Sequence, residues 1–74
     1  MTTETTADTT TEAGVKIWRD DNGRVHRDND PAIDDSDGYR AYYIHGQLHR
    51  VDGPAVIDPE GHKEYWINGQ RQHG

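Results

Sequence analysis

The sequence predicts an all-β fold, a short antiparallel meander of stacked β-hairpins behind a disordered N-terminal tail. Three observations support this prediction. Glycines recur at one constant interval along the chain, at Gly23, Gly46 and Gly69. Two of them end two-residue links, His45-Gly46 and Asn68-Gly69, of the kind that join the strands of a hairpin. No window places apolar residues at the i, i+3, i+4, i+7 spacing of a helix.

The first 14 residues differ in composition from the rest of the chain. They contain seven Thr, three acidic side chains and no Lys or Arg. Threonine favours strands, but a strand needs an apolar face to bury, and this segment offers only Met1, Ala7 and Ala13. We therefore expect residues 1–14 to form a disordered acidic tail and residues 15–74 to form one folded domain.

Turn sequences divide the rest of the chain into strands. Asp58-Pro59-Glu60-Gly61 fits a type I turn, and residues 35–38 fit the same template without Pro. The glycines expected at turns are Gly23, Gly38, Gly46, Gly61 and Gly69. The runs between the turns predict strands near residues 15–19, 24–27, 32–34, 39–44, 47–50, 55–57, 62–67 and 70–72.

The interval that separates Gly23 from Gly46, called here the repeat interval, relates more than glycines. A shift by this interval also places His26 on His49, Arg27 on Arg50, Pro31 on Pro54, Ala32 on Ala55 and Tyr42 on Tyr65. One complete unit reads GYRAYYIHGQLHRVDGPAVIDPE, and the chain contains about two and a half such units.

These residues resemble the MORN repeat, a β-hairpin unit of the same length. The closest likeness lies in residues 65–74, with one extra residue before His73-Gly74. The His-Arg-x-Asp-Gly-Pro-Ala form at residues 49–55, and its degenerate counterpart at 26–32, resemble a MORN-like variant of uncharacterised phage and other viral proteins. The resemblance implies a scaffold or an interaction surface, by analogy with the family.

The duplicated histidines point to structure more than to chemistry. A catalytic or metal site is rarely duplicated at a repeat interval, whereas a contact between stacked units recurs by necessity. We interpret each His-Arg pair with its following acid as a polar clasp at the bend before Pro31 and Pro54. The residues of this clasp are His26, Arg27, Asp28, His49, Arg50 and Asp52.

Composition argues against several classes of function. The net charge of −6 disfavours binding to nucleic acid or to an anionic membrane. The chain has no Cys, no apolar run long enough to span a membrane and no visible secretory signal, so we expect a cytoplasmic protein.

Enzymatic and cofactor chemistry are not expected either. The chain lacks a phosphate-binding glycine motif and EF-hand spacing, and its single Ser, Ser36, lies in a predicted tight turn. His45, His49, His62 and His73 could gather at one edge and bind zinc, but their spacing does not force them together. We expect no cofactor and no metal.

The aromatic residues suggest a contact surface. Strand alternation places Tyr42, Ile44, Tyr65 and Ile67 on one face, and Tyr43 and Trp66 on the other. Either the tail, loops or Trp18 cover this second face, or a partner or second copy does. On the latter interpretation the partner-binding residues are Trp66, Tyr43 and Trp18.

The sequence therefore predicts a small non-enzymatic protein–protein interaction module. The resemblance implies a phage or viral protein that binds a host or viral protein. One alternative is a structural or accessory protein that self-associates or joins a virion. Another is a binder of a small ligand or metal.

Overall fold

The computed structural model describes residues 9–72, and within this range the chain is all-β, as the sequence predicts. None of the described residues forms a helix long and apolar enough to cross a membrane. The strands are β1 (Thr9–Thr10), β2 (Val15–Ile17), β3 (Ile33–Asp35), β4 (Arg40–Ala41), β5 (Tyr43–Ile44), β6 (Gln47–Leu48), β7 (Val56–Ile57), β8 (Lys63–Ile67) and β9 (Gln70–Gln72).

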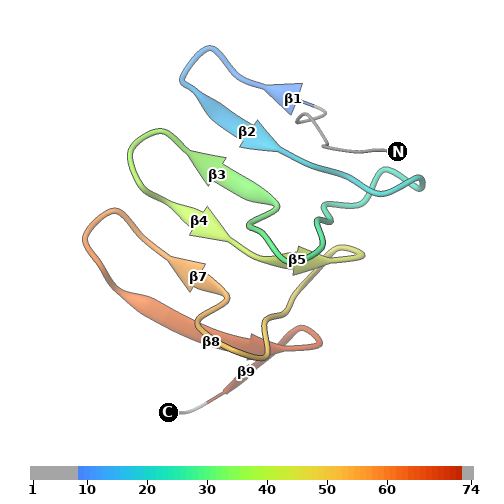
Figure 1. Cartoon of the computed structure of the whole chain (residues 1–74), viewed down its shortest axis with the longest axis vertical. Coiled ribbons are helices and arrows are strands. Elements are labelled where there is room, and N and C mark those ends of the chain that lie inside the picture. The colour runs from blue at the N-terminus through green and yellow to red at the C-terminus, as the bar shows by residue number, and fades with distance from the viewer. Residues whose placement is uncertain (1–8, 73–74) are drawn as a thin grey trace.

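Stacked antiparallel hairpins make up the main sheet. Its seven strands lie in the order β1-β2-β3-β4-β7-β8-β9, and β5 and β6 form a separate two-stranded sheet. Figure 1 shows the hairpins β1–β2, β3–β4 and β7–β8 one above another, with their turns on the same side of the molecule. The antiparallel meander is therefore confirmed.

The predicted strand at 39–44 is divided at Tyr42 into β4 and β5, which belong to different sheets. The Tyr42 N–H donates to the carbonyl of Ala55 (2.7 Å), whereas its carbonyl accepts from the N–H of His49 (3.0 Å). The backbone thus changes hydrogen-bonding partner at this residue. Trp18 has the same arrangement, because its N–H donates to Ala32 (2.8 Å) and its carbonyl accepts from His26 (2.9 Å).

The prediction of a strand at 24–27 is wrong, because this segment forms only an isolated bridge between Arg19 and Val25. Its other backbone hydrogen bonds go back to residues 18–20 as well as forward to the next hairpin. The His26 N–H donates to the carbonyl of Trp18 (2.9 Å), and the Arg24 carbonyl accepts from Asp20 (2.8 Å). The Val25 carbonyl accepts from Gly46 (2.7 Å), and the Arg27 N–H donates to Tyr43 (3.1 Å). The segment therefore pairs with residues 18–20 and also bonds to the next hairpin.

The N-terminal boundary of the domain also differs from the prediction. Residues 9–14 form a hairpin with β2, in which Thr9 pairs with Ile17 and Thr10 with Lys16. Backbone hydrogen bonds hold this hairpin, and both residues of β1 are exposed. The absence of an apolar face therefore does not prevent pairing with the edge of β2. Residues 1–8 lie outside the described residues.

The turns use left-handed backbone conformations where the sequence places glycine. The pairs His45-Gly46 (φ 48° and 84°) and Asn68-Gly69 (φ 51° and 79°) both have two positive φ angles, as a type I′ hairpin link requires. Gly23, Gly38 and Gly61 also have positive φ.

The core is small and consists mainly of alanine. Ala32, Ala41 and Ala55 are fully buried, and Trp18 is 7% exposed. Ala32 lies beside Ala41, to whose carbonyl its N–H donates (2.9 Å). Small side chains at these positions leave room for the hairpins to pack closely, and Trp18 is the one large side chain among the buried apolar residues of the described range.

Candidate functional site

Two His-Arg segments join successive hairpins through equivalent contacts. The Nδ1 atom of His26 accepts a hydrogen bond from the backbone N–H of His45 (2.9 Å). The Nδ1 atom of His49 accepts one from the N–H of Asn68 at the same distance. Each imidazole thus receives the first N–H of the following two-residue turn, and as a neutral ring it carries its proton on Nε2.

The two arginines of these segments lie over aromatic rings. The guanidinium carbon of Arg27 is 3.8 Å from the ring centroid of Trp18, and that of Arg50 is 4.0 Å from the ring of Tyr42. Such cation–π contacts stabilise the charged guanidinium group. Both side chains are only about a quarter exposed, at 22% and 27%.

Each arginine also holds the bend that follows it. Arg27 donates to the carbonyl of Pro31 (3.4 Å), and Arg50 donates to that of Pro54 (3.2 Å). The structure therefore brings together the residues of the predicted clasp. The acid that pairs with the arginine stands at a different position in each segment. In the second segment it is Asp52, two residues after Arg50 (3.3 Å).

In the first segment the acid beside the arginine is Asp30 (3.7 Å). Asp28 instead lies 3.3 Å from the Nε2 atom of His26. In the second segment a Cβ atom on Gly53 would meet the Arg50 guanidinium at 3.0 Å, so glycine leaves room for this arginine.

A shallow groove of about 340 Å³ lies between the two segments. Its lining includes the two arginines, apolar surface and several polar side chains. The lining residues are Arg27, Asn29, Tyr42, Ile44, His49, Arg50, Val51 and Asp52. Val51, on this groove, is 79% exposed. Sequence reasoning missed it, although Val51 follows His49-Arg50 where Asp28 follows the equivalent pair.

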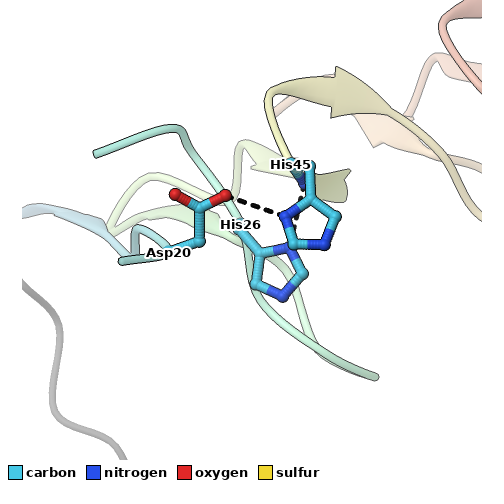
Figure 2. Close-up of side chains that lie close together, drawn as sticks. All are labelled: Asp20, His26 and His45. Atoms are coloured by element: carbon cyan, nitrogen blue, oxygen red, sulfur yellow. Dashed lines mark hydrogen bonds and ion pairs between the residues drawn. The ribbon is translucent and has the colours of Figure 1, made fainter. Parts of the chain in front are cut away.

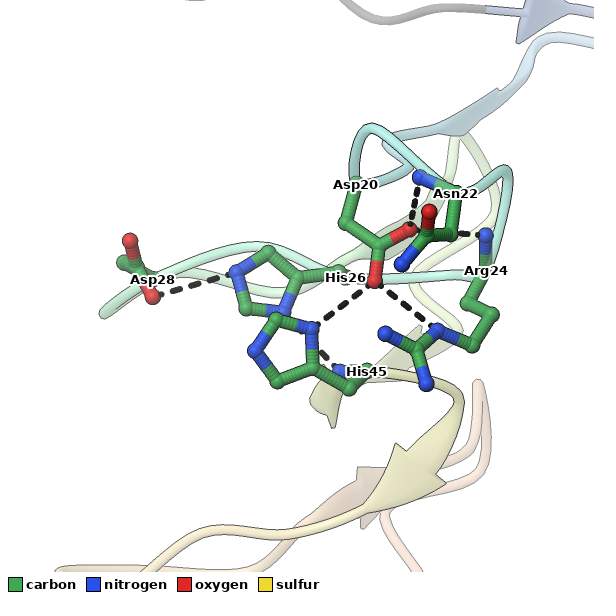
Figure 3. Close-up of polar contacts among 6 residues, drawn as sticks. All are labelled: Asp20, Asn22, Arg24, His26, Asp28 and His45. Carbon is green, nitrogen blue, oxygen red and sulfur yellow. Dashed lines mark hydrogen bonds and ion pairs between the residues drawn. The ribbon is translucent and has the colours of Figure 1, made fainter.

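A second cluster surrounds the carboxylate of Asp20, whose side chain is 9% exposed (Figure 3). Its Oδ1 atom accepts from the N–H groups of Asn22 (2.8 Å) and Arg24 (3.0 Å). Its Oδ2 atom lies 2.8 Å from Nδ1 of His45 and 3.1 Å from Nε of Arg24. The hydrogen bond from His45, helped by the backbone N–H groups, holds the pKa of Asp20 well below its usual range.

The same arrangement recurs at Asp58. Its Oδ1 atom accepts from the N–H groups of Glu60 (3.0 Å) and His62 (2.8 Å), and its Oδ2 atom lies 2.9 Å from Nδ1 of His62. Burial acts to raise the pKa of Asp58, but the hydrogen bonds from His62 and Glu60 outweigh it and lower that pKa. The recurrence indicates that both aspartates organise turns.

Three residues near Asp20 could be considered as metal ligands. Asp20, His26 and His45 each place one ligand atom within 4.8 Å of the others (Figure 2). This trio differs from the His45, His49, His62 and His73 set that the sequence suggested, of which His73 lies outside the described residues.

The hydrogen bonding of the trio does not suit a metal ion. Both oxygens of Asp20 already accept two hydrogen bonds each, and Nδ1 of His26 accepts the backbone N–H of His45. The two imidazole rings stack, with centroids 4.3 Å apart and planes inclined by 22°. Because ring nitrogens bind metals in the ring plane, stacked rings cannot both direct a lone pair at one ion. The trio fits a hydrogen-bonded turn.

The three residues predicted to bind a partner lie in different environments. Trp18 is 7% exposed and belongs to the core, so it offers little surface to a partner. Tyr43 and Trp66 are partly exposed, and the indole N–H of Trp66 donates to Glu64 (3.1 Å). Among the described residues, the exposed large apolar side chains are Val51 and, at 43%, Tyr65.

No protein-family model, curated protein or solved structure matches the chain.

Proposed function

We propose that this protein is a small non-enzymatic module that binds another protein at the groove between its two His-Arg segments. The exposure of Val51 carries the proposal. Val51 is 79% exposed and lines one groove with the apolar side chains of Tyr42 and Ile44, and grouped apolar surface of this kind marks an interaction site.

The lining of the groove supports a protein partner. Tyr42, Ile44 and Val51 offer apolar contact, and Arg27 and Arg50 each have guanidinium N–H groups beyond those bonded to proline carbonyls. The volume of about 340 Å³ is at the small end of ligand sites. It suits one inserted side chain surrounded by polar contacts.

The same volume also admits a small ligand, which is the second candidate function. Self-association, including assembly into a virion, is less favoured, because two copies of a chain with net charge −6 repel each other. The MORN-like resemblance favours a phage or other viral protein that acts in the cytoplasm of a host, and this origin belongs to the proposal. The acidic balance disfavours nucleic acid and anionic membranes as partners.

The test is affinity capture with three forms of the chain. Val51→Ser removes the apolar contact at a site too exposed to affect folding, and Ala13→Ser is the matched control in the distant β1–β2 turn. The proposal requires a protein that the wild type and Ala13→Ser bind directly, with affinity for Val51→Ser about tenfold weaker, since burial of valine contributes about 1.5 kcal/mol. Equal binding by all three forms would place the contact elsewhere.

A further inference from the structure

Tyr65 is the third member of a series of aromatic residues whose first two members are covered by arginine. Tyr65 follows Tyr42 by the repeat interval, and Tyr42 follows Trp18 by that interval and one position more. The first two have matching backbone bonds, in which the N–H donates to a buried alanine and the carbonyl accepts from a histidine. Tyr65 pairs with Gln72, which stands one repeat interval after His49.

The exposure of the rings follows the presence of arginine. Trp18 lies under Arg27 and Tyr42 lies under Arg50. Trp18 is buried and Tyr42 is partly buried, whereas Tyr65 is exposed. The residue one repeat interval after Arg50 is His73, which lies outside the described residues. Tyr65 remains 43% exposed.

We infer that the exposed ring of Tyr65 is a docking site for an arginine side chain of a partner protein. The chain itself shows the chemistry twice, because it covers each preceding aromatic ring with a guanidinium group at 3.8 and 4.0 Å. Arginine suits this position better than lysine, because its planar group stacks on an aromatic face and is more weakly hydrated.

Charge favours a basic segment of another protein over a second copy of this chain. The net charge of −6 attracts a cationic segment and opposes self-association. The inference shares one premise with the proposed function, namely that the partner is a protein. The two sites are different, because Tyr65 does not line the groove.

The experiment titrates the intact chain with an alternating Gly-Arg octapeptide, followed by NMR of the Tyr65 ring and the Gln72 amide. The comparison peptide carries citrulline in place of arginine and so keeps the shape but removes the charge. We expect shifts at both probes with the arginine peptide, and binding about 2- to 5-fold weaker with Tyr65→Leu, which corresponds to about 0.5–1 kcal/mol. Tyr65→Phe should bind like the wild type and Tyr65→Trp more tightly.

Two controls separate this site from other sources of binding. Val51→Ser alters the groove and should leave the response of Tyr65 unchanged, so failure of one proposal is distinguishable from failure of the other. Because Tyr65→Trp keeps a large ring, it serves as the test if Tyr65→Leu does not fold. Equal responses to arginine and citrulline, equal affinity of all Tyr65 variants, or self-association in sedimentation that requires Tyr65 would each overturn the inference.

Discussion

At the scale of single residues, one carboxylate can organise a whole turn. Asp20 and Asp58 each accept two backbone N–H groups on one oxygen and an imidazole on the other. The sequence shows both as Asp followed by Gly three positions later, which predicts a turn but not the imidazole partner. His62 belongs to the same turn as its aspartate, whereas His45 reaches Asp20 from the next hairpin. Only the three-dimensional stacking of hairpins could reveal that second contact.

The lowered pKa of Asp20 leads to a prediction about acid stability. An aspartate whose pKa is lower in the folded chain than the ordinary 3.8 contributes stability above that value, and this stability is lost as the pH falls further through the folded pKa. Asp20→Asn should therefore be less stable than the wild type at pH 7 and should lose less stability between pH 4 and pH 2. Urea denaturation at several pH values, with Asp58→Asn as the parallel variant, measures this difference. Identical acid sensitivity of wild type and Asp20→Asn would contradict it.

At the scale of elements, the hairpin links were well predicted and the strand limits less well. His45-Gly46 and Asn68-Gly69 could be recognised because the φ angles of a type I′ link restrict the sequence strongly. The division of a strand at Tyr42 could not, because it depends on which neighbours the backbone meets on each side. The hairpin at residues 9–14 had a signal in Gly14, which precedes Gly38 by nearly the same interval as Gly38 precedes Gly61.

Gly69 provides the prediction at this scale. Its φ of 79° is one that a residue with a Cβ atom adopts only with strain, while an added Cβ would meet Gln47 at an ordinary distance of 3.5 Å. The cost of Gly69→Ala is therefore a backbone cost, and we expect a loss of about 1–2 kcal/mol in the free energy of unfolding. Chemical denaturation measures it, and Gln70→Ala, an exposed neighbour in β9, is the control that should change little. An unchanged stability would mean that the β8–β9 link is not a type I′ turn.

At the scale of the whole molecule, the apolar side chains fall into two groups, those that are buried and stabilise the fold and those that are exposed and can contact a partner. The sequence placed Trp18, Tyr43 and Trp66 together as candidate contact residues, because strand alternation cannot distinguish a buried aromatic from an exposed one. The structure buries Trp18 beneath Arg27 and leaves the other two partly exposed. The clasp residues could be predicted from their repetition, whereas the exposure of Val51 and Tyr65 depends on how the hairpins stack.

The last prediction follows from how small this core is. The buried apolar residues within the described range are Trp18 and three alanines, and alanine contributes little apolar area. Trp18→Ala would leave a cavity that backbone-bonded hairpins cannot close, at a cost of about 3–5 kcal/mol. A domain of this size has a stability near the lower end of about 5–15 kcal/mol, so this variant should be largely unfolded at 37 °C. Trp66→Ala and Tyr43→Ala, at partly exposed positions, should remain folded with smaller losses. Circular dichroism during thermal unfolding compares all three variants with the wild type. If Trp66→Ala destabilises the chain as much as Trp18→Ala does, then the core extends to the face that carries Trp66, and that indole is not available to a partner.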